Sequence, residues 1–390
     1  MRTRQEIEAL EEKNLACFAM KSKDSAGRVY KEPDHPTRTA YQRDRDRIVH
    51  CEAFRKLEYK TQVFTIFEGD YYRTRLTHTI EVAQIARTIG RNLCLNEDLI
   101  EAIALAHDLG HPPFGHAGEN TLNDIMEKAK AGSFNHNLRS FEIVTRYERK
   151  YPDFIGLNLS EEVRVGILKH ETNYDKSEDI AHLKHVGPVL EAKVVDIADA
   201  LAYLSHDIDD GLTSGCITAD DLKESTLWQK ASKLVPVNVD KEMFKYQIVR
   251  ALIDVQMKDL LTQSQSNLEK CSFASSGEVK EHHLKNKHTP VIAFSDLMKE
   301  ERDKLQKLLH KKLYEHYRVV RMTDKARRII EDLFRVYENN PQQLPYSVYN
   351  RSENYSEMEK YKIICNYIAA MTDRFALDEH KKLFDPYEKV

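Results

Sequence analysis

The sequence predicts a mostly α-helical protein, and three observations lead to this fold class. Apolar residues recur over much of the chain at the spacing of a helix that buries one face. Alternating, strand-like stretches are scarce, and the best of them is QVFTIF at 62–67. The chain has 390 residues, enough for a large core and two or three subdomains at roughly 150 residues each.

The strongest helical patterns lie in the first half of the chain. Residues 79–93 place aliphatic side chains on one face, and His78 starts that same inward face. Residues 97–108 open with two acids that suit a helix N-terminus, and a glycine and two prolines then end the helix. Residues 190–207 form a third apolar helix. Further helices are predicted for 296–316, 323–338 and 357–377.

Charge and hydropathy divide the chain into four parts. The first 45 residues are rich in both signs of charge, so we expect them to wrap around the rest as an arm. A polar stretch that has little apolar content predicts a boundary between two helical regions. The predicted parts are an N-terminal arm (1–45), a helical catalytic core (46–262), a polar loop or insertion (263–290) and a C-terminal helical region (291–390). Residues 171–187 are predicted to form a second polar loop.

Composition excludes several classes of protein. The 63 acids outnumber the 59 lysines and arginines, and this net charge of -4 argues against binding of bulk polyanions. Binding of single-stranded nucleic acid stays open but has no support. No apolar run approaches the roughly 20 residues of a membrane span, and the N-terminus lacks an apolar signal-peptide centre. Six scattered cysteines without a CxxC pair are typical of reduced thiols, so we expect a cytoplasmic protein.

The motif HDLGHPPFGH at 107–116 is the most informative stretch of the chain. It places three histidines and an aspartate directly after the apolar run AIALA. Polar groups without partners beside a core helix would cost several kcal/mol. The motif therefore predicts a bound ligand, and an imidazole followed by a carboxylate is typical of a metal site.

We predict that three helices deliver four ligands to one divalent metal ion. Two imidazoles and two carboxylates suit Mn, Fe, Ni, Co or Zn, and Mg less tightly. Four protein ligands leave one or two positions open for water or a phosphate oxygen, as a hydrolytic site requires. Taken singly, a histidine could be a core residue, and an aspartate could cap a helix or pair with an arginine. Spacing and inward-facing helices together favour the ligand set His78, His107, Asp108 and Asp199.

The chain resembles the HD-domain superfamily of metal-dependent phosphohydrolases, whose pattern is H…HD…D. More narrowly, it resembles the bacterial deoxyguanosine triphosphate triphosphohydrolases. The specific segments are KTQVF (60–64), HDLGHPPFGHAGE (107–119) and MTDRFA (371–376), and further matches cover 43–64, 73–87, 104–119, 134–140, 191–212 and 366–376. The resemblance implies an HD-domain helical core and hydrolysis of a deoxynucleoside triphosphate, dGTP first, to deoxynucleoside and inorganic tripolyphosphate.

The resemblance also implies roles for residues around the metal. His116 and His136 would line the reacting phosphate, with Glu119 orienting one of them. A histidine near its ordinary pKa of about 6.5 can protonate an alkoxide leaving group at neutral pH. His111 could either join this group or cap the Gly-Pro turn.

Substrate contacts are expected on the metal-bearing helix and near its neighbours. Asp199, Tyr203 and Asp207 recur at i, i+4 and i+8, which aligns them on one helix face. In related enzymes the tyrosine packs against the deoxyribose and the aspartate binds the 3′-hydroxyl, and Gln62 resembles the residue that completes that contact. Arg75, one turn before His78, can hold a phosphate oxygen. Further phosphate candidates are Arg55, Lys60 and Arg73.

Several alternatives stay open. Another HD activity would be that of a 5′-nucleotidase or of a cyclic-nucleotide or alarmone phosphodiesterase. A non-enzymatic protein would bind nucleotide or single-stranded nucleic acid as a regulator. The resemblance also suggests a homo-oligomer and a second dNTP as allosteric activator. Asn366 and Ala200 depart from the family pattern, and Asp373 and Arg374 are predicted to form an ion pair that docks the C-terminal helix.

Overall fold

The computed structural model describes residues 1–62, 72–171, 183–236, 238–286 and 289–389. Within these ranges the chain is folded into α-helices, and its only β-pairing consists of two isolated bridges, so the predicted fold class is confirmed. Most of the strand predicted at 62–67 lies outside the described ranges. The helices are α1 (Arg4–Asn14), α2 (Ala40–Val49), α3 (Glu52–Lys56), α4 (Arg75–Asn92), α5 (Glu97–Ala106), α6 (Gly115–Lys128), α7 (His136–Glu142), α8 (Glu161–Leu168), α9 (Leu190–Ser214), α10 (Ala219–Leu222), α11 (Thr226–Ser232), α12 (Lys241–Cys271), α13 (Ser276–Lys285), α14 (Asp296–Leu309), α15 (Tyr317–Asn339), α16 (Glu357–Ala369) and α17 (Asp373–Phe384).

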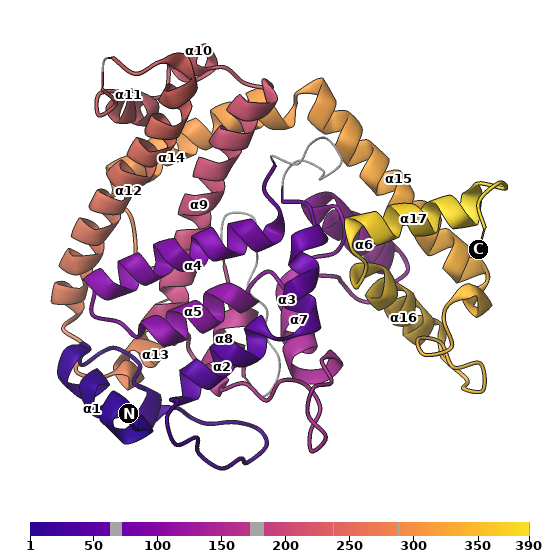
Figure 1. The fold of residues 1–390 in the computed structure, drawn as a ribbon, viewed down its shortest axis with the longest axis horizontal. Coiled ribbons are helices and arrows are strands. Elements are labelled where there is room, and N and C mark those ends of the chain that lie inside the picture. The colour runs from indigo at the N-terminus through magenta and orange to yellow at the C-terminus, as the bar shows by residue number, and fades with distance from the viewer. Residues whose placement is uncertain (63–71, 172–182, 237, 287–288, 390) are drawn as a thin grey trace.

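Helices α4, α5 and α9 form the centre of the molecule (Figure 1). Capping side chains start two of them: the side chain of Thr74 accepts a hydrogen bond from the amide of Thr77, and Asn96 caps α5 in the same way. The apolar stripe of α4 is buried against α5 and α9. Burial of such stripes supplies most of the stability of a helical core. Helix α9 ends at Gly215, whose φ of +69° closes the last turn.

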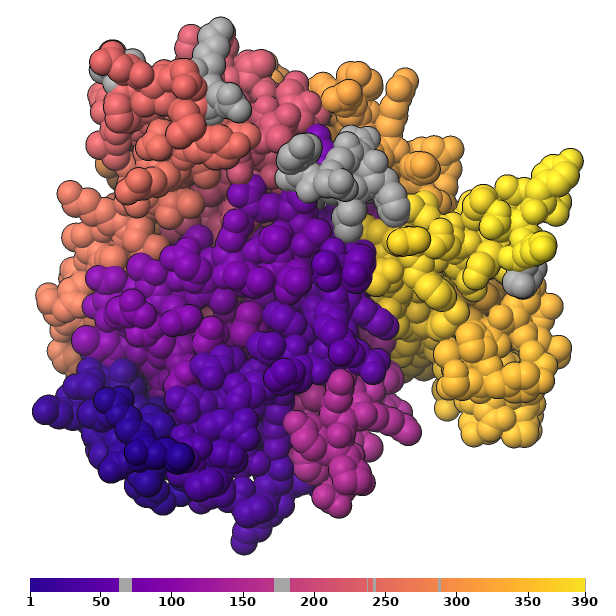
Figure 2. Space-filling model, viewed as in Figure 1, coloured from indigo at the N-terminus to yellow at the C-terminus, as the bar shows by residue number. Residues whose placement is uncertain are grey.

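A second hydrophobic cluster joins α6 to the C-terminal helices. Leu122 and Met126 of α6 pack with buried side chains of α15 and α16, among them Ile330 and Ile368. Helix α15 belongs to both clusters, because Val319 near its start lies in the first. It therefore connects the body of the molecule to the lobe formed by α16 and α17, which stands out on one side (Figures 1 and 2).

The prediction of a polar loop at 263–290 is wrong. Helix α12 continues to Cys271, and α13 occupies Ser276–Lys285. Polar side chains on α12 bind the backbone of the extended segment that follows: Asn267 donates to the Val291 carbonyl (3.0 Å), and Ser264 Oγ accepts from the Ala293 amide (3.1 Å). The polar side chains that make this stretch look like a loop in the sequence thus form hydrogen bonds to buried backbone groups of a neighbouring segment.

Three other predicted boundaries also differ from the structure. The border at residue 45 falls inside α2. The helix predicted for 357–377 is interrupted after Ala369, and Thr372 caps a new helix, α17. The helix predicted for 296–316 leaves α-geometry after Leu309 and continues as a π-helical turn, η5 (His310–Tyr314).

The N-terminal arm is held by backbone hydrogen bonds. The Ala16 amide donates to the Cys94 carbonyl at 2.9 Å, and the Met20 amide donates to the Glu191 carboxyl at 2.8 Å. The arm therefore contacts both the α4–α5 turn and the start of α9. None of the described helices has the length and apolar character needed to cross a bilayer.

Candidate functional site

The four predicted metal ligands converge from three helices. His78 lies in the first turns of α4, His107 and Asp108 follow α5 directly, and Asp199 lies in the middle of α9. All four side chains are buried. The Asp199 Oδ1 atom lies 2.9 Å from His78 Nε2 and 3.8 Å from His107 Nε2, and Asp108 lies 3.6 Å from His107 Nε2 and 4.0 Å from His78 Nε2.

The surroundings of His107 Nε2 indicate whether the four side chains suit a cation. His107 Nδ1 lies 2.7 Å from the Ala104 carbonyl and must donate its proton there. The Nε2 atom then carries a lone pair, yet it is buried and has no hydrogen-bond partner among the described residues. An unsatisfied buried polar atom costs about 1–3 kcal/mol. A divalent ion bound to Nε2 would remove this cost, so the donor set fits a metal.

The ionisation states also suit a metal. Burial raises the pKa of Asp108, but the neighbouring His107 and Arg75 outweigh it and hold that pKa well below the usual range. Burial acts in the same direction on Asp199, where hydrogen bonds from histidines prevail and lower the pKa. Burial lowers the pKa of His107. The site thus presents carboxylates and a neutral imidazole, which are the forms that bind metals.

Of the predicted phosphate cations, Arg75 contacts the ligand set. Its Nη1 atom donates to Asp108 Oδ2 at 3.0 Å, and its buried Nε and Nη2 atoms have no partner within the described chain. Lys60 is buried against the carbonyl of His111, and burial lowers its pKa to about 7. The other two candidates lie elsewhere: Arg73 pairs with Glu81, Asp209 and Asp210, and Arg55 is exposed on α3.

Glu119 holds two of the candidate catalytic histidines. Helix α6 begins directly after the Pro-Pro turn, which places His116 in its first turn and Glu119 one turn later. His116 Nδ1 lies 3.2 Å from one oxygen of Glu119, and His136 Nδ1 lies 2.8 Å from the other. Burial raises the pKa of Glu119, but these histidines outweigh it and the net shift is strongly downward. Glu119 is therefore a carboxylate that orients both rings.

His111 connects the metal ligands to this second group. Its Nε2 atom lies 3.1 Å from Asp108 Oδ1, and its ring stacks on that of His136 with centroids 3.9 Å apart. The buried Nδ1 atom has no hydrogen-bond partner within the described residues and lies 3.8 Å from Glu119. His111 thus lies inside the site rather than at its edge, which the sequence left undecided.

The predicted sugar-binding residues gain a partner that the sequence did not indicate. The hydroxyl of Tyr314, in η5, lies 2.6 Å from Asp207 Oδ2 and 2.7 Å from the Tyr203 hydroxyl. Burial raises the pKa of Asp207 well above its usual value. Asp207 Oδ1 and Gln62 Oε1 are buried without partners in the described chain, so both can serve a ligand. The ring of Tyr203 lies 6.3 Å from that of His116, centroid to centroid.

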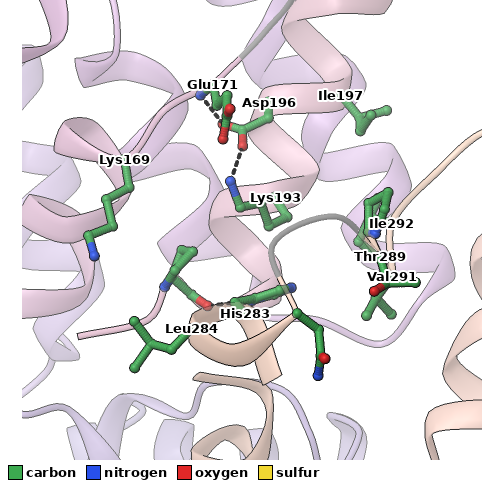
Figure 3. A pocket seen from close by; sticks show the side chains of 13 residues that line it. Lys169, Glu171, Lys193, Asp196, Ile197, His283, Leu284, Thr289, Val291 and Ile292 are labelled. Carbon is green, nitrogen blue, oxygen red and sulfur yellow. Dashed lines mark hydrogen bonds and ion pairs between the residues drawn. The ribbon is translucent and has the colours of Figure 1, made fainter. Parts of the chain in front are cut away.

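A second missed residue is His170, which follows α8. Its Nε2 atom lies 3.3 Å from Asp199 Oδ2, and its Nδ1 atom lies 2.7 Å from Asp196, which in turn pairs with Lys193 at 2.7 Å (Figure 3). These contacts fix the Asp199 carboxylate from behind. Lys193 and Asp196 line a pocket of about 280 Å³ between α9 and α13. One signal was present in the sequence, because His170 follows an apolar helical run just as His107 does.

The predicted ion pair between Asp373 and Arg374 is wrong. Asp373 is buried and accepts hydrogen bonds from the amides of Thr61 (3.0 Å) and Phe114 (2.9 Å). Arg374 is exposed and faces Asp378. Asp373 therefore ties α17 to the segments that contain Thr61 and Phe114. Asn366, which departs from the family pattern, accepts a hydrogen bond from Arg139 through its side-chain oxygen at 2.9 Å.

Comparison with known proteins agrees with this geometry. The family profile of the HD domain matches residues 75–204, which contain all four candidate ligands, and that of the phosphohydrolase-associated domain matches 292–382. A deoxyguanosinetriphosphate triphosphohydrolase-like protein of Geobacter metallireducens is 48% identical over 385 residues, 97% of either chain. Proteins of the same description from Geobacter sulfurreducens and Ralstonia nicotianae are each 46% identical, over 98% and 96% of this chain and 98% and 95% of their own.

Proposed function

This chain belongs to the deoxyguanosinetriphosphate triphosphohydrolase-like family of HD-domain proteins, and on that premise we propose that it hydrolyses deoxynucleoside triphosphates. The products would be a deoxynucleoside and inorganic tripolyphosphate, and dGTP is the first substrate to test. The family defines the broader class, a metal-dependent phosphohydrolase.

One observation carries the proposal. Helix α9 presents the candidate metal ligand Asp199 and, at intervals of one turn, Tyr203 and Asp207, while the ring of His116 lies beside Tyr203. A substrate that places a phosphate at the ligand set therefore places its sugar along the same helix, near an aromatic ring and the buried Asp207 Oδ1 atom, which has no partner among the described residues. A triphosphate joined to a deoxyribose has this shape.

The four candidate ligands would hold one divalent ion, which supplies a Lewis acid for the phosphate and an activated water. Arg75 contributes a guanidinium that is fixed by Asp108, and its other two nitrogens, which have no partner among the described residues, can bind phosphate oxygens. Because the side chain is fully buried, this charge is held in a low-dielectric setting where it stabilises developing negative charge most strongly.

The proton chemistry falls to the histidines around Glu119. Water forms a bond to the α-phosphorus and gives up a proton, the bond from that phosphorus to O5′ breaks, and O5′ takes up a proton. Glu119 accepts from His116 Nδ1, so a second proton on Nε2 of the same ring is the one that can pass to O5′, and the proton that water gives up replaces it. His116 is the most exposed of these rings, at 29% of its side chain, so a substrate can reach it.

The deoxyribose would lie against Tyr203. A ring packed on C2′ leaves no room for a 2′-hydroxyl, which is a steric route to selection of deoxynucleotides. Asp207, whose pKa burial raises, can donate a hydrogen bond to O3′ while Gln62 Oε1 accepts the 3′-hydroxyl proton. The Tyr314 hydroxyl supports both Tyr203 and Asp207.

A product assay tests the proposal. The purified protein, loaded with Mn²⁺ or Mg²⁺, is given each dNTP alone and in pairs, and tripolyphosphate is separated from pyrophosphate and phosphate by ion chromatography. Pairs are included because a second dNTP is the expected activator. The proposal is supported if the parent protein releases tripolyphosphate and if His107→Ala and Asp108→Ala each lose both this activity and metal binding. No tripolyphosphate from any dNTP, or full activity in either variant, refutes it, and phosphate or nucleoside monophosphate as product would indicate another HD activity.

A further inference from the structure

Behind the candidate ligand His78 lies a pair of residues that the mechanism above does not use. The Nδ1 atom of His78 lies 3.1 Å from Nδ1 of His206, which belongs to α9. The Nε2 atom of His206 lies 2.6 Å from Oε2 of Glu81, which lies one turn after His78 on α4. The contacts thus run from His78 on α4 to His206 on α9 and back to Glu81 on α4. His78 is 1% and His206 4% exposed, so water does not compete for the contact between the two rings.

The hydrogen-bond chemistry of imidazole selects one arrangement of protons. A carboxylate can only accept, so His206 must donate to Glu81 from Nε2. A neutral imidazole carries one proton, so Nδ1 of His206 is left as an acceptor. The proton between the two Nδ1 atoms must then belong to His78. With its proton held at Nδ1, His78 can bind a metal ion through Nε2 when the ion takes the place of the present 2.9 Å contact between Nε2 and Asp199.

We propose that Glu81 and His206 are positioning residues that hold His78 in the tautomer and orientation that bind a divalent metal ion. The inference rests on the metal site of the proposed function. Glu81 is itself fixed, because Arg73 donates to the same oxygen at 2.9 Å and is anchored by Asp209 and Asp210 at 2.8 Å each. Outer partners of this kind set ligand basicity and ring orientation in other metal sites.

Binding of Mn²⁺ to the metal-free full-length protein tests the proposal without reference to any substrate. Free Mn²⁺ is measured by electron paramagnetic resonance during titration. We expect His206→Leu to weaken Mn²⁺ binding about 10- to 100-fold, the usual effect of losing such a partner. His206→Asn places an amide oxygen near the position of Nδ1 and should recover most of the affinity, which a purely space-filling role for the ring would not produce.

A double-mutant cycle shows whether Glu81 acts through His206. Glu81→Ala alone should weaken Mn²⁺ binding, and it should have no further effect when added to His206→Leu. Glu97→Ala is the matched control, because it removes a carboxylate that pairs with Arg91 of α4 and does not contact His206 or Glu81. We expect this control to bind Mn²⁺ like the parent protein.

Each outcome decides the matter. The proposal is overturned if His206→Leu binds Mn²⁺ within about twofold of the parent, if Asn is as poor as Leu, or if the effect of Glu81→Ala persists in the His206→Leu background. If His206→Leu does not fold, Glu81→Ala against Glu97→Ala still tests it, since 42% of the Glu81 side chain is exposed and its loss leaves no cavity. A parent protein that binds Mn²⁺ but releases no tripolyphosphate would refute the proposed function alone, whereas one that binds no Mn²⁺ would refute this inference as well.

Discussion

Glu191 is expected to make the stability of this protein depend on pH. It lies at the start of α9, fully buried, and its Oε1 atom accepts from the amides of Met20 (2.8 Å) and Asn96 (3.2 Å). Its other oxygen has no partner within the described residues. The carboxyl therefore joins the N-terminal arm and α5 to the helix that carries Asp199. Burial raises the pKa of Glu191 to about 7.

The sign and size of the effect follow from proton linkage. Between its ordinary pKa of 4.5 and the folded value of about 7, the folded state binds more protons at Glu191 than the unfolded state. Stability is therefore highest below pH 4.5 and is lost as the pH rises to 7. At about 1.4 kcal/mol per pKa unit, the loss between pH 5 and pH 8 is about 2–3 kcal/mol.

The substitution Glu191→Gln isolates the contribution of Glu191 to the pH dependence of stability. The amide oxygen still accepts both backbone hydrogen bonds, but the side chain cannot ionise. Relative to the parent, the variant should gain about 2–3 kcal/mol between pH 5 and pH 8, or about 3 °C in Tm for a chain of 390 residues. Any cost of placing an NH2 group at the unpartnered oxygen is present at both pH values and cancels.

Thermal melts of both proteins at pH 5 and pH 8 measure this difference. Glu52→Gln, on the exposed face of α3, is the control for the change in net charge. The reasoning is refuted if the stability difference between Glu191→Gln and the parent is the same at both pH values, or if the control shows the same pH dependence.

Three further outcomes concern the site. Glu119→Gln should lower kcat about 100-fold or more, because His116 and His136 lose the carboxylate that orients them. The affinity for Mn²⁺ should stay unchanged, and a parallel loss of Mn²⁺ binding would place Glu119 among the metal ligands. Asp207→Ala should raise KM for dNTP about tenfold or more with Mn²⁺ binding intact, and an unchanged KM would remove it from the sugar contact. Removal of metal by a chelator should lower Tm by about 3 °C relative to protein at 100 times its Kd for Mn²⁺, since saturation adds about 2.7 kcal/mol; identical melts with and without metal would contradict the site.

Periodicity predicted the helices whose apolar stripes face a common core. The helices predicted at 79–93, 97–108 and 190–207 correspond to α4, α5 and α9; α5 and α9 begin at the predicted residues, and α4 begins four residues earlier. Helix α12 was not predicted, and its part beyond residue 262 was assigned to a loop. Its polar side chains bind the backbone of 291–295, and a polar residue has the same letter whether it faces water or a neighbouring chain segment.

The same contrast holds for the candidate site. The ligands His107 and Asp108 are adjacent in the sequence, and Tyr203 and Asp207 follow Asp199 at the repeat of a helix, so local spacing alone places them on shared faces. Tyr314, His170 and His206 were missed because each acts on a residue of another helix, and no local repeat connects those positions.

The sequence by itself determined the fold class, the helices that bury a stripe, and which chemical groups the chain can bring to a metal and a phosphate. These follow from short-range periodicity and from residue type. Only the tertiary structure decided which group touches which: the unpartnered His107 nitrogen, the carboxylate of Glu119 shared by two rings, and the pair that faces His78. The reason is that packing of whole helices sets contacts to a fraction of an ångström across more than 100 residues of chain, whereas spacing along one helix is fixed by its 3.6-residue turn.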